Sequence, residues 1–430
     1  MKVAFFTLGC KVNQYETDLM MKSFSDNGYE IVDFNEKSDI YVINSCSVTN
    51  LSTRKTRQYL SKAKRNGGVV VLAGCYAQEI KGKEELQNVD IVIGNQEKNN
   101  VVKYVENYIK EKKIDNKTIY KIGEISQVKK YVQSNNLDKG INIRESIKIE
   151  DGCNNFCSYC IIPYVRGRVR SRNLSDILKE VNLLVKSGVG EIVLVGIEIA
   201  SYGKDLDENI TLIDVVEEVS KISELKRIRL GSIEPRILTK ENIIRLSKIE
   251  KLCPHFHISV QSLDNNVLKS MNRKYTREDV IAITQIIREN FKDVAFTCDI
   301  IVGFPGETKE EFENTIQGVK QIGFYEVHAF KYSKRKWTRA ATMENQVDGN
   351  VAQKRSEELI ALATLQKQEY MKLYIGKNLE VLCESFKDGY LSGYTKNYIK
   401  VKIKGDEKYL GNCINVNITG IENEVLIGKI

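Results

Sequence analysis

Cys153-Asn154-Asn155-Phe156-Cys157-Ser158-Tyr159-Cys160 places three cysteines at the spacing C-x₃-C-x₂-C. Thiolates this close in sequence can ligate one metal centre. Zinc sites and 4Fe–4S clusters normally take four protein ligands, and no histidine lies nearby to supply a fourth. The spacing therefore predicts a 4Fe–4S cluster with one iron left open to an exogenous ligand. Three buried structural cysteines are the alternative, but ordered spacing in an asparagine-rich loop is not typical of core cysteines.

The composition of the whole chain sets the outer bounds. Its 430 residues predict two or three domains, and 42% hydrophobic with 28% charged residues is typical of a soluble globular protein. Ten cysteines are too few for a disulfide scaffold, which favours a reducing, cytoplasmic location, and no apolar stretch is long enough for a membrane span. Three histidines argue against chemistry built on histidine acids and bases. The net charge of +8 is compatible with a polyanionic partner such as nucleic acid.

The first 110 or so residues alternate apolar runs with helical patterns, which predicts a Rossmann-like parallel sheet covered by helices. The expected strands are 3–7, 40–43, 69–72 and 89–93, and the expected helices are 16–27, 51–64 and 79–86. Three of these strands lead into Cys10, Cys46 and Cys75. Because the carboxyl ends of parallel strands share one edge, the three thiols should converge on a second three-ligand iron–sulfur cluster. Cysteines that end strands by coincidence are the alternative.

Residues 113–140 are expected to be a basic linker, and the βα pattern resumes over residues 141–370. About six βα units are present, with strands near 191–195, 227–230, 257–260, 295–302 and 327–331 after the one that precedes Cys153. Six units predict an open (β/α)₆ partial barrel with active groups at the carboxyl ends of its strands. The expected cofactor-binding residues at these ends are Tyr159, Gly196, Ser232, Glu234, His257, Ser259, Gln261 and Asp299. A hydrogen-bonded polar core, and a packing role for Tyr159, are the alternatives.

Two basic stretches are candidates for contact with an anionic substrate. Arg166, Arg168, Arg170 and Arg172 alternate after the cysteine loop and would share a face if extended. They should hold an anionic substrate or stabilise the charge of the cluster. Residues 371–430 predict a small all-β barrel in which aromatic residues and lysines interleave, as in nucleic-acid-binding barrels. The residues concerned are Tyr394, Lys396, Tyr398 and Lys400. Solvated charge and an ordinary barrel with lysine-protected edges are the alternatives.

Together these features resemble the radical S-adenosylmethionine (SAM) methylthiotransferases over essentially the whole chain. The stretches 7–16, 151–153, 161–168 and 170–172 are similar to the type that modifies threonylcarbamoyladenosine next to the tRNA anticodon. The resemblance implies a methylthiotransferase domain at 1–112, a linker at 113–140, a radical SAM domain at 141–370 and an RNA-binding TRAM domain at 371–430. The sequence departs from the family at Leu263 and Trp337, where glycine is usual.

The resemblance also implies a mechanism. Cys153, Cys157 and Cys160 would bind the catalytic 4Fe–4S cluster, which cleaves SAM to a 5′-deoxyadenosyl radical that abstracts hydrogen from C2 of the modified adenine. Cys10, Cys46 and Cys75 would bind a second 4Fe–4S cluster that carries the sulfur to be inserted, and a second SAM would supply the methyl group. The implied partners are tRNA, an external electron donor and a sulfur source.

Rival functions remain open from the sequence. A methylthiotransferase that acts on isopentenyladenosine in tRNA or on a ribosomal protein would share this architecture. A non-catalytic iron–sulfur protein that binds RNA or carries electrons is another alternative, although electron carriers normally saturate their clusters with protein ligands.

Overall fold

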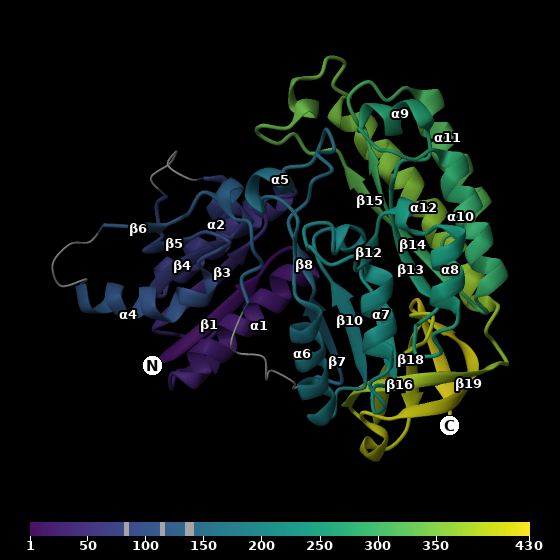
Figure 1. The fold of residues 1–430 in the computed structure, drawn as a ribbon, viewed down its shortest axis with the longest axis horizontal. Coiled ribbons are helices and arrows are strands. Elements are labelled where there is room, and N and C mark those ends of the chain that lie inside the picture. The colour runs from purple at the N-terminus through teal and green to yellow at the C-terminus, as the bar shows by residue number, and fades with distance from the viewer. Residues whose placement is uncertain (81–85, 112–116, 134–141) are drawn as a thin grey trace.

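The computed structural model describes residues 1–80, 86–111, 117–133 and 142–430 and divides into three parts (Figure 1). The amino-terminal part is a six-stranded parallel sheet in the order β2-β1-β3-β4-β5-β6. Its strands are β1 (Lys2–Thr7), β2 (Glu30–Val32), β3 (Ile40–Ser45), β4 (Val69–Gly74), β5 (Ile91–Ile93) and β6 (Ile119–Lys121). The central strands β3 and β4 are buried at every position, as expected for a sheet with both faces covered.

Helices cover both faces of this sheet. α1 (Lys11–Asp26) and α4 (Val101–Glu111) contribute to the core on one face, and α2 (Asn50–Arg65) and α3 (Cys75–Glu79) to the core on the other. The predicted Rossmann-like fold is therefore confirmed. α1 begins directly after Cys10, earlier than the expected helix 16–27. Most of the expected helix 79–86 lies outside the described residues, and the helix that the structure places here is α3.

The linker contributes one strand to the first sheet. β6 extends the amino-terminal sheet by pairing in parallel with β5, and the short 3₁₀ turn η2 (Ile125–Gln127) follows. Nothing is described for residues 112–116 and 134–141. The predicted basic linker thus supplies an edge strand to the first sheet before the chain enters the central part.

The central part is an open parallel barrel made from the sheets β11-β10-β7 and β12-β13-β14-β15. Its strands are β7 (Arg144–Lys148), β10 (Glu191–Val195), β11 (Arg227–Leu230), β12 (Ser232–Ile233), β13 (His255–Gln261), β14 (Ala295–Val302) and β15 (Glu326–Lys331). The outer layer contains α6 (Leu174–Lys186), α7 (Leu212–Ser220), α8 (Lys240–Ser247), α9 (Asn265–Ser270), α10 (Arg277–Asn290), α11 (Lys309–Ile322) and α12 (Gly349–Lys372). This arrangement confirms the predicted partial barrel, with short β12 directly after β11.

Short elements surround the cysteine loop at the carboxyl ends of the barrel strands. β8 (Glu150–Asp151) pairs with β9 (Arg170–Ser171), and α5 (Ile162–Val165) lies between them. Val12 of α1 packs against Val193 and Val195, which project from β10 opposite to the outer core. The first turn of α1 therefore covers part of the inner side of the open barrel.

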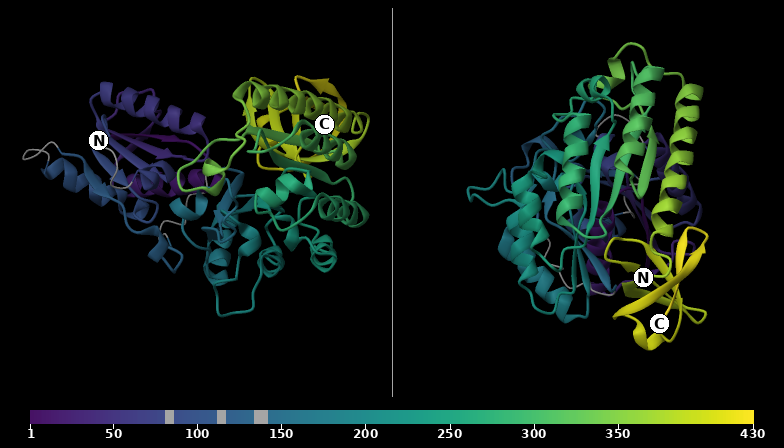
Figure 2. Two further views of the ribbon diagram at one scale, coloured as in Figure 1. Left: turned by 90° about the horizontal axis from the view of Figure 1, so that it is seen from above. Right: turned by 90° about the vertical axis from the view of Figure 1, so that its right-hand side faces the viewer.

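The carboxyl-terminal part is a closed five-stranded barrel in the order β16-β17-β18-β20-β19. Its strands are β16 (Asn378–Lys387), β17 (Tyr390–Thr395), β18 (Lys400–Lys404), β19 (Cys413–Glu422) and β20 (Val425–Lys429). It lies below the central barrel in two views (Figures 1 and 2), and Arg227 of β11 donates to the carbonyl of Tyr394 at 2.8 Å. In the described part of the chain, no helix is both long and apolar enough to cross a membrane.

The two departures from the family pattern have different structural settings. Leu263 is fully buried and packs against Gly318 of α11. It fits because Gly318 has no side chain, since a Cβ there would lie only 2.7 Å from the Cβ of Leu263. Trp337 has φ +65° and is 42% exposed. A side chain in this left-handed region carries a backbone cost that glycine avoids. The departure at Leu263 is accommodated, whereas that at Trp337 is strained.

Candidate cluster and substrate sites

The amino-terminal cysteine triad forms at one edge of the first sheet, as predicted. Cys10, Cys46 and Cys75 follow β1, β3 and β4. Burial, then the neighbouring thiols of Cys75 and Cys10, raise the pKa of Cys46 to about 12. Gly9 has φ +109°, and a Cβ there would lie 2.9 Å from the Cβ of Cys46. The glycine before Cys10 therefore permits the close approach of two cysteine loops.

The second triad forms in the loop after β8. Burial and the adjacent Cys157 thiol raise the pKa of Cys160 to about 12. Burial also raises the pKa of Cys153, and the thiols of Cys160 and Cys157 add to this increase. The guanidinium of Arg273 donates from Nη1 to Cys157 Sγ at 3.2 Å. The backbone N–H of Asn155 donates to Cys153 Sγ at 3.4 Å. A bound metal centre that deprotonates these thiols would thus meet donors already in place.

The spread of the thiols bears on the kind of metal centre they fit. Two thiolates on one zinc ion lie at most about 4.6 Å apart, because each Zn–S bond is about 2.3 Å. Among the residues that the structure describes, the one group of three metal-ligating side chains within 4.8 Å of one another is His257, Asp299 and His328. Both cysteine triads are wider than this. They fit a polynuclear iron–sulfur cluster, in which each thiolate binds its own iron.

Glu198 is a functional candidate that the sequence analysis missed. It follows β10, accepts a hydrogen bond from Asn155 of the cysteine loop at 3.2 Å, and its Oε1 is buried without a partner. Burial and the nearby Glu234 raise the pKa of Glu198 to about 7. A buried carboxylate with an orphaned oxygen beside the cluster loop fits the ammonium group of SAM. The sequence signal was a lone glutamate two residues after Gly196.

Gly196 itself does not leave room for a cofactor, which corrects the expectation above. A Cβ at this position would lie 2.8 Å from Glu150 Oε2 and 2.8 Å from Ile199 Cγ2. The space beside Gly196 is therefore filled by the protein. Tyr159 is partly buried in an apolar cluster with Val267, Met271 and Phe304, which agrees with its packing alternative.

The predicted alternation along β13 is present. His257, Ser259 and Gln261 are half-buried on one face, whereas their neighbours Ile258 and Val260 are fully buried on the other. Ser259 and Gln261 lie toward the end of the strand, and the Ser259 carbonyl accepts from Arg273 Nη2 at 3.0 Å. Ser232 is exposed and Glu234 is buried at the end of the neighbouring strand.

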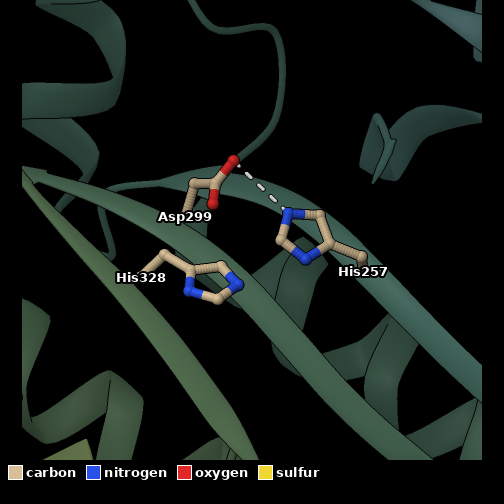
Figure 3. Close-up of side chains that lie close together, drawn as sticks. All are labelled: His257, Asp299 and His328. Atoms are coloured by element: carbon tan, nitrogen blue, oxygen red, sulfur yellow. Dashed lines mark ion pairs between the residues drawn. The ribbon is translucent and has the colours of Figure 1, made fainter. Parts of the chain in front are cut away.

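His257, Asp299 and His328 come from the adjacent strands β13, β14 and β15, and Figure 3 shows their polar ends turned toward one another. His257 Nε2 lies 3.3 Å from Asp299 Oδ2. His257 Nδ1 lies 2.8 Å from Thr297 Oγ1, and the ring of His328 stacks on that of His257 at 5.7 Å. His257 and Asp299 were predicted from the sequence, whereas His328 was not. This group lines the barrel interior and is separate from both cysteine triads.

The four arginines after the cysteine loop do not share one face, and Arg166 contacts the sulfur of Cys75 instead of solvent. Arg166, Arg170 and Arg172 are buried, and each pairs with a carboxylate contributed by another part of the chain. Arg168 is exposed and lies over the ring of Phe156 at 4.5 Å. Of the four arginines, Arg168 is therefore the one positioned to meet a phosphate.

Arg166 joins the two triad regions through Glu16 of α1. Its Nη2 donates to Glu16 Oε2 at 2.9 Å, and Lys148 of β7 donates to Glu16 Oε1 at 2.7 Å. Lys98 of the 3₁₀ turn η1 (Lys98–Asn100) is the third cation on this carboxylate. Although burial opposes ionisation, these three cations hold the pKa of Glu16 well below its ordinary value. The first sheet and the barrel are thus tied by a buried ionic network.

Two of the predicted RNA-contacting residues, Tyr394 and Tyr398, are half-buried against the central barrel. The rings of Tyr394 and Tyr398 stack at 4.8 Å, and the guanidinium groups of Arg144 and Arg229 lie 5.2 Å and 4.4 Å from the Tyr398 ring centroid. The carbonyl of Lys396 accepts from Arg229. Lys400 is exposed on β18, where the exposed lysines alternate with buried residues. The lysines, rather than the tyrosines, are therefore available at the barrel surface.

Comparisons with known proteins agree with these sites. Residues 147–318 match the Radical SAM superfamily, and residues 2–94 match the uncharacterized protein family UPF0004. The chain is 41% identical to the threonylcarbamoyladenosine tRNA methylthiotransferase MtaB of Bacillus subtilis, over 97% of this chain and 93% of that protein. It is 37% identical to the protein of the same name from Aquifex aeolicus, over 97% of this chain and 100% of that protein.

A tRNA-2-methylthio-N(6)-dimethylallyladenosine synthase from Acetivibrio thermocellus is 33% identical, over 99% of this chain and 90% of that protein. Among solved structures, the radical SAM methyltransferase TsrM from Kitasatospora setae has a TM-score of 0.58 at 14% identity, over 79% of this chain and 75% of that one. The structural likeness supports the fold. Radical SAM proteins use a 4Fe–4S cluster and SAM, which are therefore this protein's cofactors. On its sequence, fold and paired cysteine triads, the chain belongs to the radical SAM methylthiotransferase family.

Proposed function

We propose that the protein inserts a methylthio group at C2 of N6-threonylcarbamoyladenosine next to the anticodon of tRNA. The observation that carries this proposal is the pair of three-thiol sites, one at the edge of the first sheet and one at the barrel. Two separate sites with three ligands each suit one centre for radical formation and another for sulfur delivery. The 41% and 37% identities to proteins named for this nucleoside support the choice of substrate.

The residues of the barrel site have distinct proposed roles. Cys153, Cys157 and Cys160 would hold the cluster that, when bound, supplies reductive cleavage of SAM. Arg273 donates to Cys157 Sγ and would offset the negative charge of the ligated thiolates. The carboxylate of Glu198 would bind and orient the SAM ammonium group beside this loop.

The amino-terminal site would hold the second 4Fe–4S cluster through Cys10, Cys46 and Cys75. Arg166 Nε lies 3.3 Å from Cys75 Sγ and would stabilise that sulfur as a thiolate. The same side chain contacts Glu16 at 2.9 Å, so the second cluster site is fixed in place relative to the barrel. This arrangement would hold the two sites at one constant separation during the reaction.

Binding of tRNA is proposed to use the exposed basic residues. Arg168 lies next to the cysteine loop, and Lys400, Lys402 and Lys404 are exposed along β18. Guanidinium and ammonium groups bind phosphate oxygens without regard to base sequence. The stacked pair Tyr394 and Tyr398 would instead keep the terminal barrel seated against the central one.

The decisive test is a reaction with two tRNA substrates. Anaerobically reconstituted protein is incubated with SAM, sulfide and dithionite, and with tRNA that carries either threonylcarbamoyladenosine or dimethylallyladenosine. Mass spectrometry of the nucleosides should detect the methylthio product from the first substrate. Product from the second tRNA alone would overturn the assignment of the nucleoside, and 5′-deoxyadenosine without either product would overturn the assigned reaction.

A further inference from the structure

Lys11 occupies the place where the three parts of the molecule meet. It is the first residue of α1 and follows Cys10. The next residue, Val12, packs against β10 on the inner side of the barrel. Lys11 Nζ lies 5.8 Å from the ring centroid of Tyr398, in the connection between β17 and β18. The Lys11 side chain is solvent-accessible and therefore open to a ligand that enters this junction.

The charged groups around Lys11 leave it as the cation without an anion. Arg144 and Arg229 lie over the same Tyr398 ring as Lys11, at 5.2 Å and 4.4 Å from its centroid, so three positive charges are gathered here. Both of these arginines have carboxylate partners, since Arg229 Nε lies 2.7 Å from Glu191 Oε1 and Arg144 Nη1 lies 3.3 Å from Glu384 Oε1. Among the described residues, no carboxylate oxygen lies within the 4.0 Å ion-pair distance of Lys11 Nζ. An incoming anion would relieve this excess of positive charge.

The wall of the same interior is polar. The Tyr398 ring that Lys11 faces lies 4.8 Å from the ring of His255 of β13. His255 and His257 both contact Thr297 Oγ1, so Lys11 lies toward the face of β13 that carries His257. Beyond His255 lies the group of His257, Asp299 and His328 (Figure 3). Thr297 fixes the orientation of the His257 ring, and His328 is exposed. Because both ring nitrogens of His257 are already engaged, by Thr297 and Asp299, the wall offers a ligand the ring nitrogens of His328 and the second carboxylate oxygen of Asp299.

These groups match the chemistry of one of the two adenosine substituents under consideration. A threonylcarbamoyl group carries a carboxylate, a hydroxyl and a ureido group, all of which require polar partners when buried. A dimethylallyl group is a hydrocarbon and would cover the Lys11 ammonium and the His328 ring without giving them a hydrogen-bond partner, which is costly. A carboxylate on Lys11 would instead form a charge-assisted hydrogen bond.

We propose that Lys11 is a specificity-determining residue whose ammonium group binds the carboxylate of the threonylcarbamoyl substituent. The wall of His257, Asp299 and His328 receives the hydroxyl and ureido groups. This assignment rests on the proposed function and names the residues that recognise its substrate. The potential ligand atoms of these three residues are also close enough for one metal ion to bind all three. His257, however, already contacts Asp299 at 3.3 Å without an ion.

The test compares three anticodon stem-loop RNAs that differ at one adenosine. The first carries threonylcarbamoyladenosine, the second carries its carboxyl methyl ester, and the third is unmodified. Binding to the reconstituted full-length protein is measured by fluorescence anisotropy. The wild type should bind the free carboxylate roughly 10- to 100-fold more tightly than the ester, as expected for a hydrogen bond between charged groups. Lys11→Gln should remove this preference and leave the affinity for unmodified RNA unchanged.

Lys22→Gln is the matched control, because Lys22 lies on the same helix, at the surface, paired with Asp26. His328→Asn should weaken binding of the threonylcarbamoyl RNA several-fold and spare the unmodified RNA. Iron content is measured for every variant, because Lys11 adjoins Cys10. A Lys11→Gln protein with about half the iron would assign Lys11 to cluster assembly and overturn its assignment to the carboxylate.

Other results would also overturn the proposal. Equal weakening toward all three RNAs would make Lys11 a phosphate contact, and a retained preference for the free carboxylate would remove it from recognition. If the wild type forms the methylthio product on threonylcarbamoyladenosine but binds ester and acid equally, this inference fails while the proposed function stands. Failure of the wild type to form that product would count against the function itself.

Discussion

Arg166 Nε lies 3.3 Å from the sulfur of Cys75, although 91 residues separate the two in the chain. Arg166 belongs to the loop after the barrel cysteines, and Cys75 lies at the edge of the first sheet. The same guanidinium binds Glu16, so one side chain couples the geometry of a proposed cluster ligand to the packing of the two domains.

Replacement of Arg166 should therefore affect both stability and cluster binding. We expect Arg166→Met to lower the free energy of unfolding by about 3 kcal/mol, because Glu16 loses its bidentate partner inside the protein. Iron bound at the amino-terminal site should fall as well. Chemical denaturation and iron analysis measure the two effects, with the exposed Arg168→Met as the control. Unchanged values for both would show that the contacts of Arg166 carry little energy.

The two triads should be separable by mutation. We expect Cys10→Ala, Cys46→Ala and Cys75→Ala together to halve the iron content and abolish the methylthio product while SAM cleavage continues. The corresponding triple replacement of Cys153, Cys157 and Cys160 should abolish both activities. The assay follows 5′-deoxyadenosine and modified nucleoside in one reaction. Methylthio product from the amino-terminal triple mutant would contradict the assigned roles.

The buried Glu16 should make the stability of the protein depend on pH in the acidic range. Its pKa is held well below the ordinary value in the folded protein, so the ionised carboxylate contributes stability above its unfolded pKa of about 4.3. This contribution is lost as the pH falls from there toward the folded pKa. We expect the thermal midpoint of cluster-free protein to drop between about pH 5 and pH 3, and to drop less in Glu16→Gln. Parallel pH profiles for the two proteins would show that other carboxylates dominate.

The exposed lysines of β18 should set the salt dependence of tRNA binding. We expect joint replacement of Lys400, Lys402 and Lys404 by glutamine to reduce the slope of log affinity against log salt by about 2, since each phosphate contact contributes about 0.7 to 0.9. Lys179→Gln on α6 with Lys221→Gln, directly after α7, is the control, because both lysines are exposed. A slope equal to that of the wild type would place the RNA elsewhere on the protein.

Trp337 should be a strained position. Its φ of +65° favours glycine, so Trp337→Gly should stabilise the protein by about 1 kcal/mol. Trp337→Ala removes the same indole ring, including its packing 6.1 Å from the ring of Tyr164, but keeps a Cβ. The thermal midpoint of the glycine variant should exceed that of the alanine variant. The reverse order would show that strain at this residue is minor.

Strand patterns and cysteine positions were enough to predict most of the fold and which cysteines lie together. Cys10, Cys46 and Cys75 were placed together because parallel strands end at one sheet edge, a rule that needs no tertiary detail. The ionic partners of the arginines could not be predicted in this way. The alternation in sequence indicated that the arginines could share one face. In the folded chain, however, each buried arginine meets a different carboxylate. The pairs are Arg166 with Glu16, Arg170 with Asp151 and Arg172 with Glu180.

The environment of individual side chains was the other feature that could not be predicted from the sequence. Gly196 was interpreted as space for a cofactor, whereas Glu150 and Ile199 fill that space. Glu198 has no distinctive motif, and its importance follows from burial beside the cysteine loop. Tyr394 and Tyr398 have the composition of an RNA platform, but the domain that packs against them decides which way they face.

The position of Arg166 in the chain has a consequence for biogenesis. The ribosome completes the first sheet, with Cys10, Cys46 and Cys75, before it adds the arginine that contacts Cys75. During that interval Glu16 also lacks Arg166 and Lys148, two of its three cations. A nascent sheet is therefore poorly prepared to retain iron and sulfide, and stable loading of this site should follow translation of the cysteine loop that completes it.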